Sequence, residues 1–208
     1  MEPFLYDAMV KHRTDLERSA RPRVLEEILR LLRGGAAHRS TYLMWDTGVL
    51  AVILPELASY LDDDAVDAEL VWKRLSVIDR LKQDGDLPGD AVLVASLLWE
   101  PLAEWLEGAR DASIAFEEFF DDISVRLAVP RRLKDRIRSI TIAQRRLRSG
   151  KLGALPRRDF FPDAAALFAI DQEARGEPIP RWVNEPTAAG LEAPSASRSR
   201  RRRRRRRR

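Results

Sequence analysis

The residues best suited to chemistry in this 208-residue chain are ten arginines close to its C-terminal end. They are Arg198, Arg200, Arg201, Arg202, Arg203, Arg204, Arg205, Arg206, Arg207 and Arg208. A guanidinium pairs with a phosphate through two parallel hydrogen bonds, so the run suits a polyanion, and nucleic acid is the polyanion we expect. Because the run has no apolar surface to bury, we expect it to be disordered. The alternatives are a tail that only aids solubility and a translated low-complexity repeat.

A second group of cations lies inside the part of the chain that can fold. Residues 130–151 hold nine basic residues and one acidic residue, whereas residues 1–129 hold 14 basic and 25 acidic residues. Apolar residues in the basic stretch recur at helical spacing and predict a helix seated by one face: Leu133, Ile137, Ile140 and Leu147. With cations along both rims, such a helix could follow a phosphate backbone. The cations that we assign to this role are Arg131, Arg132, Lys134, Arg138, Arg145, Arg146 and Arg148.

The alternative for this helix is a solvated face whose arginines cover acidic neighbours from residues 1–129. Aromatic residues nearby that could stack on bases are few, namely Phe160, Phe161 and Trp182, and each is more typical of a core. The independent basicity of the tail favours nucleic acid over the alternative.

Carboxylates and histidines predict no comparable site. Asp62 and Asp64 have the spacing of a metal-binding pair, but no strand pattern precedes them, and we expect them to cap a helix over residues 65–83. The chain has no cysteine and only two histidines, which excludes disulfides and leaves little material for a transition-metal site. We therefore expect no catalytic or metal-binding residues.

The elements that must position the cations are helices. Strand-type alternation is missing, and glycine and proline fall between the periodic segments. We expect Asp90 to cap a strongly apolar helix, and Pro101 to kink or restart it. The sequence thus predicts an all-α, irregular array of about seven or eight helices over residues 1–175. A disordered linker and arginine-rich tail should follow over residues 176–208.

The compartment that we expect is the cytoplasm. No apolar run approaches the ~18 residues that a membrane span needs. The first residues also lack the basic segment followed by an apolar stretch that marks a signal peptide. We expect no membrane partner.

Several short segments resemble the RNA-binding region of bacterial poly(A) polymerases, within the tRNA nucleotidyltransferase/poly(A) polymerase family. Residues 22–35 resemble the helix that opens this region, and residues 41–50 with 54–57 resemble its next helix and turn. Residues 129–133 and 159–164 are similar to later segments. An arginine-rich C-terminus is also common in that family. The resemblance covers roughly residues 1–175 and implies that the polyanion is RNA.

In that family a separate nucleotidyltransferase head adds adenylates from ATP to RNA 3′ ends, with a glycine turn and an Asp-x-Asp pair that holds metal ions. This chain has neither: we interpret Gly34 and Gly35 as a helix end. Glu26, Glu27 and Arg30 mimic the family's base-reading motif, but we interpret Glu26 and Arg30 as an i,i+4 ion pair. The resemblance therefore implies that ATP and Mg²⁺ serve only the missing head, and that this chain alone has no cofactor and no enzyme activity.

Three hypotheses follow. The first is a non-catalytic RNA-binding region that holds RNA electrostatically for 3′ adenylation or decay. The second is a fragment or split subunit of an active polynucleotide adenylyltransferase that needs a separately encoded catalytic head. The third is a protein–protein adaptor that docks an RNA helicase.

Overall fold

The computed structural model describes residues 2–66 and 68–184. Its helices, with two short 3₁₀ segments labelled η, follow in this order: α1 (Pro3–His12), η1 (Arg13–Arg18), α2 (Arg21–Arg33), α3 (Ala37–Asp46), α4 (Val49–Ile53), α5 (Pro55–Leu61), α6 (Glu69–Asp84), α7 (Asp90–Leu97), α8 (Trp99–Glu107), α9 (Ala112–Leu127), α10 (Arg131–Arg148), η2 (Leu155–Arg157), α11 (Phe161–Arg175) and α12 (Arg181–Asn184). Within the described ranges there is no strand.

The all-α fold class is confirmed, but the expected number of helices was wrong. The described residues form twelve α-helices instead of seven or eight. One cause is Gly48, whose φ of 71° ends α3 and turns the chain into α4, a conformation that glycine adopts without the strain of a Cβ. Another is Pro55, which begins the separate short helix α5 directly after α4. The restart expected at Pro101 is confirmed, because α7 ends at Leu97 and α8 begins at Trp99 with Pro101 in its first turn. A proline at residue 101 has no N–H for the carbonyl oxygen of residue 97.

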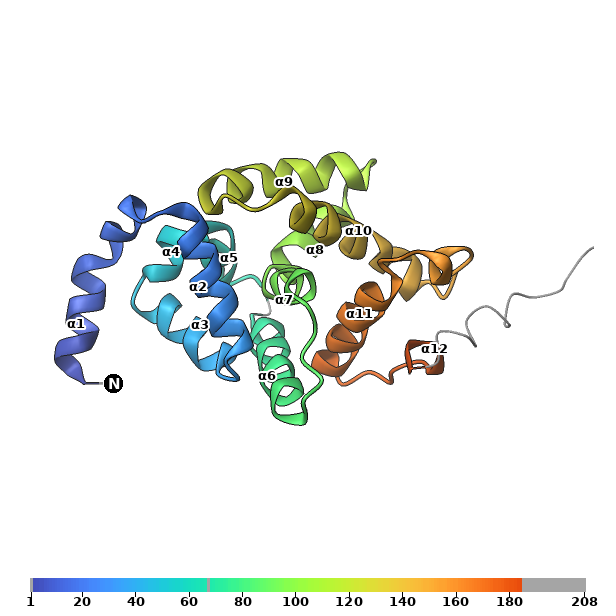
Figure 1. The fold of residues 1–208 in the computed structure, drawn as a ribbon, viewed down its shortest axis with the longest axis horizontal. Coiled ribbons are helices and arrows are strands. Elements are labelled where there is room, and N and C mark those ends of the chain that lie inside the picture. The colour runs from blue at the N-terminus through green and yellow to red at the C-terminus, as the bar shows by residue number, and fades with distance from the viewer. Residues whose placement is uncertain (1, 67, 185–208) are drawn as a thin grey trace, which may run out of the picture.

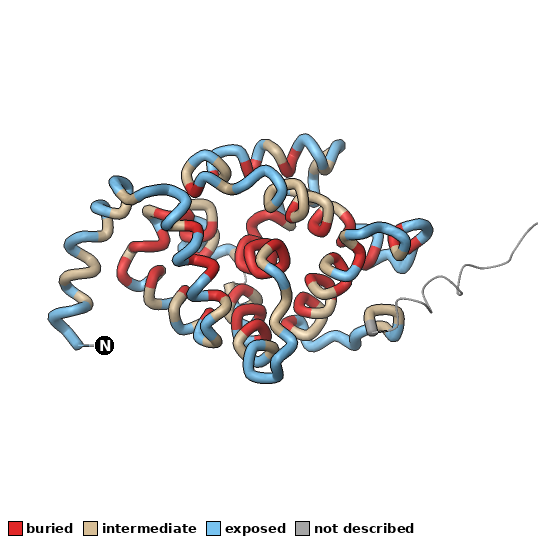
Figure 2. Tube along the Cα trace, in the orientation of Figure 1, coloured by how far each residue is buried: buried red, intermediate tan, exposed pale blue. Residues whose placement is uncertain are grey.

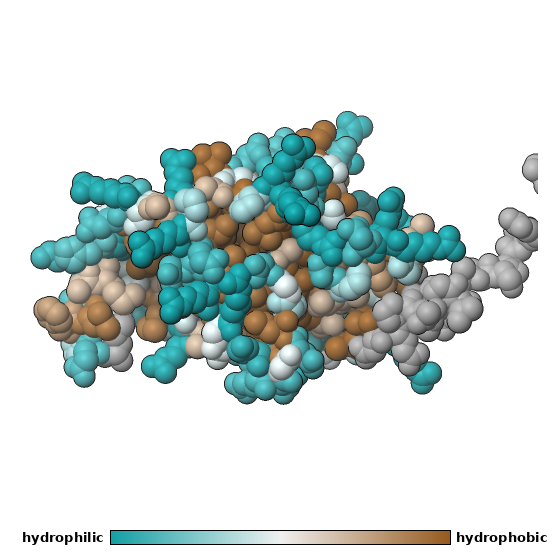
Figure 3. Space-filling view, in the orientation of Figure 1, coloured by the Kyte–Doolittle hydropathy of each residue, from teal (hydrophilic) through white to brown (hydrophobic). Residues whose placement is uncertain are grey.

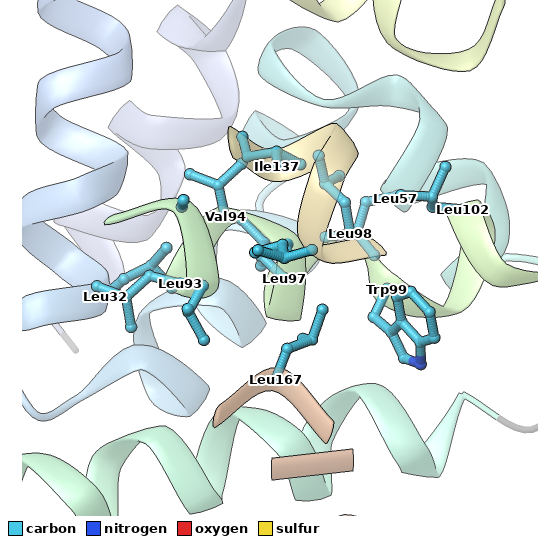
Figure 4. Close-up of a cluster of buried hydrophobic side chains, with 14 of the residues drawn as sticks. Leu32, Leu57, Leu93, Val94, Leu97, Leu98, Trp99, Leu102, Ile137 and Leu167 are labelled. Carbon is cyan, nitrogen blue, oxygen red and sulfur yellow. The ribbon is translucent and has the colours of Figure 1, made fainter. Parts of the chain in front are cut away.

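Helix α7 forms the centre of the molecule. Every residue from Ala91 to Leu97 is buried, as expected for a helix that is apolar on all sides. Figure 1 shows α7 almost end-on between the other helices, and Figure 2 shows it as a buried centre. Its side chains meet those of α2, α10 and α11 in one cluster (Figure 4): Leu32, Leu93, Val94, Leu97, Ile137 and Leu167.

The helices around α7 differ in how firmly they belong to this core. Helix α11 packs against α6, α7 and α10, whereas α1 has no buried residue and contacts mainly η1. Phe4 and Leu5 of α1 are exposed, and Figure 3 shows hydrophobic surface at this end of the molecule. The basic helix, α10, is therefore held in place by its packing against α7 and α11.

Two local expectations about charged residues in the first third of the chain were wrong. Glu26 pairs with Arg33 at 2.9 Å, and Arg30 lies 3.7 Å from Glu27 instead. Asp62 does not cap a helix but accepts a hydrogen bond from the indole of Trp45, because α6 begins at Glu69 and not at residue 65. Gly34 and Gly35 do end α2 as expected, with Gly35 at a φ of 79°.

Asp90 was also expected to be a cap, and the structure gives it another partner. It is the first residue of α7, whose N-cap position is Gly89. Both carboxylate oxygens of Asp90 accept from Arg33 of α2, at 2.9 and 2.6 Å. The hydrogen bonds with Asp90 raise the pKa of Arg33 despite its burial. This ion pair joins α2 to α7.

The residues that follow α11 pack back against it. Residues 176–184, assigned to a disordered linker, include α12, and Trp182 packs against Phe161 and Phe168 with ring centroids 6.1 and 5.2 Å apart. The predicted tail arginines, Arg198 and residues 200–208, lie outside the described residues. Within the described part of the chain, no helix combines the length and the apolarity needed to cross a membrane.

Candidate nucleic-acid interface

Helix α10 is seated as its apolar spacing predicted. Ile137, Ile140 and Leu147 are buried and Leu133 is half-buried. The buried amide of Gln144 adds a polar anchor, because it donates to the carbonyl oxygen of Ala164 in α11 at 2.9 Å. The cations of α10 then fall into two groups that differ in their acidic partners.

The first group consists of cations bound to carboxylates of the body. The ammonium of Lys134 lies 2.7 Å from both Glu117 and Asp121 of α9, and its side chain is only 17% exposed. Burial lowers the pKa of Lys134, but the hydrogen bonds to Asp121 and Glu117 outweigh it and raise the pKa above its ordinary value. Arg138 shares Glu117 at 3.1 Å and reaches Asp135 at 3.4 Å.

Arg136 also belongs to this group. It binds Asp163 of α11 at 2.7 Å and Asp159 at 3.0 Å. A further bond goes to the carbonyl oxygen of Asp159. Arg136 thus fastens the loop of residues 149–160 back along α10.

Arg148 is drawn into a buried ion network. Asp171 of α11, 1% exposed, accepts from Arg74 of α6 at 2.6 Å, from Arg148 at 2.9 Å and from Arg175 at 3.1 Å. Glu100 of α8 accepts from Arg74 and, at 3.2 Å, from Arg175. The network therefore joins four helices, and Arg148 also lies 5.2 Å above the ring of Trp99.

Asp171 is the carboxylate around which this network is built. Burial alone would raise the pKa of Asp171, but the charge and hydrogen bond of Arg74, with the charges of Arg148 and Arg175, outweigh it. The pKa of Asp171 consequently lies below its ordinary value, and its carboxylate is charged at neutral pH.

The second group consists of exposed cations with weaker ties or none. Arg131 is 94% exposed and lies 3.8 Å from Asp135, while Arg146 donates to the carbonyl oxygen of Leu152 at 3.2 Å. Arg132 and Arg145 are exposed, and neither has an ion pair within the described residues. Of the cations assigned to RNA binding, these four remain available to a ligand, whereas Lys134, Arg138 and Arg148 are occupied.

The sequence analysis missed three further cations in the loop after α10. Lys151, Arg157 and Arg158 are exposed, and no carboxylate pairs with them in the described part of the chain. Together with Arg145 they form a group that we call the cationic end. The signal in the sequence was the loop itself, which contains one acidic residue, Asp159, and that residue is bound to Arg136.

The last described residues lie beside the cationic end. Trp182 of α12 packs against Phe161, the first residue after the loop of residues 149–160. Arg181 is exposed next to it. Helix α12, which ends at Asn184, is therefore fastened to the start of α11, next to this loop.

The three aromatic residues considered as base-stacking candidates lie in or against the core. Phe161 is 1% exposed, and Phe160 and Trp182 are partly buried against the same core. A different aromatic group, unrecognised in the sequence, lies half-buried on α3 and α6: His38, Tyr42, Trp45 and Trp72.

A hollow on the opposite half of the molecule is the other surface feature. One part, of about 460 Å³, lies between η1, α2, α4 and α9 and includes Arg21, Asp122 and Arg126. The adjoining part, of about 290 Å³, is lined mainly by apolar residues: Leu16, Val24, Ile28, Leu31, Met44, Val49 and Ile53. Apolar surface of this kind is typical of docking sites.

Comparison with known proteins found no match among curated sequences. The segments 129–133 and 159–164, which resembled poly(A) polymerases, lie outside the one family match. The resemblance of residues 22–57 is confirmed: residues 1–61, from α1 to the end of α5, match the family described as the probable RNA and SrmB-binding site of polymerase A.

Proposed function

We propose that this chain is an RNA-binding, non-catalytic region of a poly(A)-polymerase-like protein, which holds RNA through phosphate contacts for 3′ adenylation or decay. The observation that carries the proposal is the cationic end. Four of the eight cations of α10 pair with carboxylates of α9 and α11, namely Lys134, Arg136, Arg138 and Arg148. Arg145 of α10 and Lys151, Arg157 and Arg158 of the following loop pair with no carboxylate among the described residues. Exposed cations without a carboxylate partner can neutralise phosphates, and the counterions condensed on the nucleic acid are then released.

The position of the cationic end supports the same function. It lies beside α12, where the chain continues toward Arg198 and residues 200–208. RNA on the cationic end could therefore engage the arginine-rich segment at the same time, and two tethered sites bind more tightly than either alone. The family match to residues 1–61 supports RNA as the polyanion.

We also propose that catalysis belongs to a separate protein or domain. ATP, Mg²⁺ and the catalytic carboxylates belong to a separate head, so this chain alone has no catalytic residue and needs no cofactor. We place its action in the cytoplasm, where RNA is adenylated and degraded in bacteria.

The test measures the salt dependence of binding to a fluorescent oligoadenylate. In full-length chain, replacing the ten tail arginines by glutamine should flatten the log–log salt slope by roughly 3 to 4, if half of them engage at about 0.7 per phosphate. Replacing Arg145, Lys151, Arg157 and Arg158 by glutamine should flatten it by roughly 1.4 to 2.8. Affinity should fall similarly for other RNA sequences, because phosphate contacts carry no sequence information.

A matched control removes four cations that are exposed, lack a carboxylate partner among the described residues and are scattered over the body: Lys11, Arg39, Lys82 and Arg110. Their replacement should change the slope by less than about 0.7, one phosphate contact. An equal flattening by both sets would show that the cationic end is not the site. An unchanged slope after tail replacement would refute the role of the arginines.

A second function, docking of an RNA helicase or of a separately encoded catalytic head, is favoured by the apolar hollow beside α2. The hollow is formed largely by residues 16–53, inside the family match. It is separate from the cationic end, so one chain could hold RNA and a protein partner together.

A further inference from the structure

The aromatic group on α3 and α6 is a connected surface cluster. Tyr42 lies 5.7 Å from both Trp45 and Trp72, and Trp45 lies 5.9 Å from Trp72, measured between ring centroids. His38 stacks on Trp72 at 5.6 Å. Tyr42 is 45% exposed and the other three rings are half-buried. Trp45 and Trp72 also pack against the core, so the cluster lies at the edge of the core and Tyr42 is its most exposed ring.

Acidic residues surround these rings. Asp62 accepts from the indole nitrogen of Trp45 at 2.8 Å, and Asp63 and Asp64 follow it in an exposed turn. Asp46 is the neighbour of Trp45, and Glu69 lies one helical turn before Trp72. Two cations, Lys73 and Arg39, lie on the same helices, and Lys73 is bound to Glu69. Five carboxylates against two cations leave the surface negative.

Negative charge around aromatic rings selects against RNA and in favour of guanidinium groups. A base could stack on the rings, but its phosphates would be repelled by the aspartates of the turn. An arginine can lie over an indole or phenol ring and at the same time pair with a carboxylate. The chemistry of the surface is therefore that of an arginine-binding site.

The chain itself contains the matching ligand in Arg198 and residues 200–208. The path from α12 to the cluster is short. Phe161, next to Trp182, and Asp171 are ten residues apart on α11, about 15 Å at 1.5 Å per residue. Asp171 contacts Arg74, and Trp72 lies two residues earlier on α6, on the opposite side of that helix. The 14 residues 185–198 can extend to roughly 46–50 Å, more than this length of α11 and a helix diameter of about 10–12 Å together.

We propose that the arginine-rich segment, residues 198–208, docks on the aromatic cluster of Tyr42, Trp45 and Trp72 and its acidic turn when RNA is absent. RNA and the cluster then compete for the same arginines. Binding of RNA releases the segment, and the free chain shields its ten cations from other polyanions. The docking itself does not depend on the proposed RNA-binding function.

The experiment uses the absence of cysteine in the chain. A nitroxide label is attached to full-length chain carrying Ser199→Cys, and the indole N–H signals of the five tryptophans are recorded by NMR. At low salt the signals of Trp45 and Trp72 should lose most of their intensity relative to the reduced label. The signal of exposed Trp105 on α8 should keep its intensity. Salt at 1 M, where the Debye length is about 3 Å, should restore the lost signals.

Matched charge variants separate a defined site from diffuse attraction. Asp62→Asn, Asp63→Asn and Asp64→Asn together remove three charges but keep the oxygens that accept from Trp45 and from the amide of Ala65. They should abolish the broadening of Trp45 and Trp72. Replacing Glu104, Glu107 and Glu118 by glutamine removes the same charge around Trp105 and should leave the broadening intact. Equal broadening of Trp72 and Trp105, or no effect of the aspartate variants, would overturn the proposal.

Addition of oligoadenylate tests whether RNA competes with the cluster for the arginine-rich segment. Added to the labelled chain, it should restore the signals of Trp45 and Trp72 by drawing the segment away. Added to an unlabelled chain whose tail arginines are replaced by glutamine, it should not shift these two signals. Shifts of Trp45 and Trp72 in that variant would assign the cluster to RNA bases and contradict the proposal. Docking without any RNA effect would support the inference while the proposed function fails.

Discussion

Two regions of the molecule use the same side chain for opposite purposes. In the contact between α6, α8, α10 and α11, Arg74, Arg148 and Arg175 pair with two buried carboxylates, Asp171 and Glu100. At the cationic end, whose residues lie within ten positions of Arg148 in the sequence, the cations are exposed and have no carboxylate partner within the described residues. The first region holds helices together, and the second is free to meet a ligand.

The difference shows that an arginine with a carboxylate partner stabilises the fold, whereas an exposed arginine without one can bind a ligand. Residues 1–129 carry 25 acidic side chains against 14 basic ones. Those of α9, Glu117 and Asp121, reach the first half of α10, and none of them reaches its far end. The carboxylates of α9 thus neutralise Lys134 and Arg138, whereas Arg132 and Arg145 stay exposed without an ion pair among the described residues.

The largest effect should come from breaking the buried network. Arg74→Met removes a fully buried cation and leaves Glu100 and Asp171 with fewer partners. Removing one member of a buried pair costs about 3–5 kcal/mol, because the remaining charge is uncompensated. Urea unfolding followed by circular dichroism should show this loss. Arg132→Met, at an exposed position, should change the free energy of unfolding by at most about 0.5 kcal/mol; similar losses for both variants would contradict the distinction.

A smaller effect should follow from pH. The pKa of Asp171 lies below its ordinary value in the folded protein, so its contribution to stability is present above the unfolded pKa of about 3.9. The contribution should disappear as the pH falls below about 4, through the folded pKa. Unfolding midpoints measured from neutral to acidic pH should therefore fall more steeply for the native chain than for Asp171→Asn. Parallel pH profiles would show that Asp171 does not supply this dependence.

Local patterns in the sequence were sufficient for the helices but not for their partners. The apolar spacing of residues 133–147 predicted the buried face of α10 because helical periodicity is a property of neighbouring residues. The ion network could not be predicted, since Arg74 and Asp171 are 97 residues apart. The aromatic cluster was missed for the same reason: only the packing of α3 on α6 brings Tyr42 to Trp72.

The predicted number of helices was wrong for a different physical reason. Gly48 lies within a stretch that was expected to form one helix, and its left-handed backbone divides that stretch into α3 and α4. The alternative considered for α10, cations that cover acidic neighbours from residues 1–129, describes Lys134 and Arg138. Arg136 pairs instead with Asp159 and Asp163. The RNA-binding role of the remaining cations stays a prediction.

The smallest effect is expected when Lys134 and Arg138 lose their carboxylate partners on α9 and become available to RNA. Glu117→Gln with Asp121→Asn removes both partners of Lys134 and one partner of Arg138. The stability lost should be small, about 0.2–1 kcal/mol for each partly exposed pair. Lys134 and Arg138 lie on the same flank of α10 as Arg145, so RNA on the cationic end should gain one or two phosphate contacts. The salt slope should then become steeper by roughly 0.7 to 1.4.

The neighbouring carboxylates of α9 provide the control. Glu118 and Asp122 have the same spacing and are exposed, and neither pairs with a cation among the described residues. Glu118→Gln with Asp122→Asn changes the net charge equally without freeing any side chain of α10. If RNA binds the cations that lose their carboxylate partners, only Glu117→Gln with Asp121→Asn should steepen the salt slope. A general effect of net charge would instead strengthen RNA binding equally in both variants. Equal slopes would mean that the pairing with α9 does not limit RNA binding, and the comparison between the two halves of α10 would lose its functional meaning.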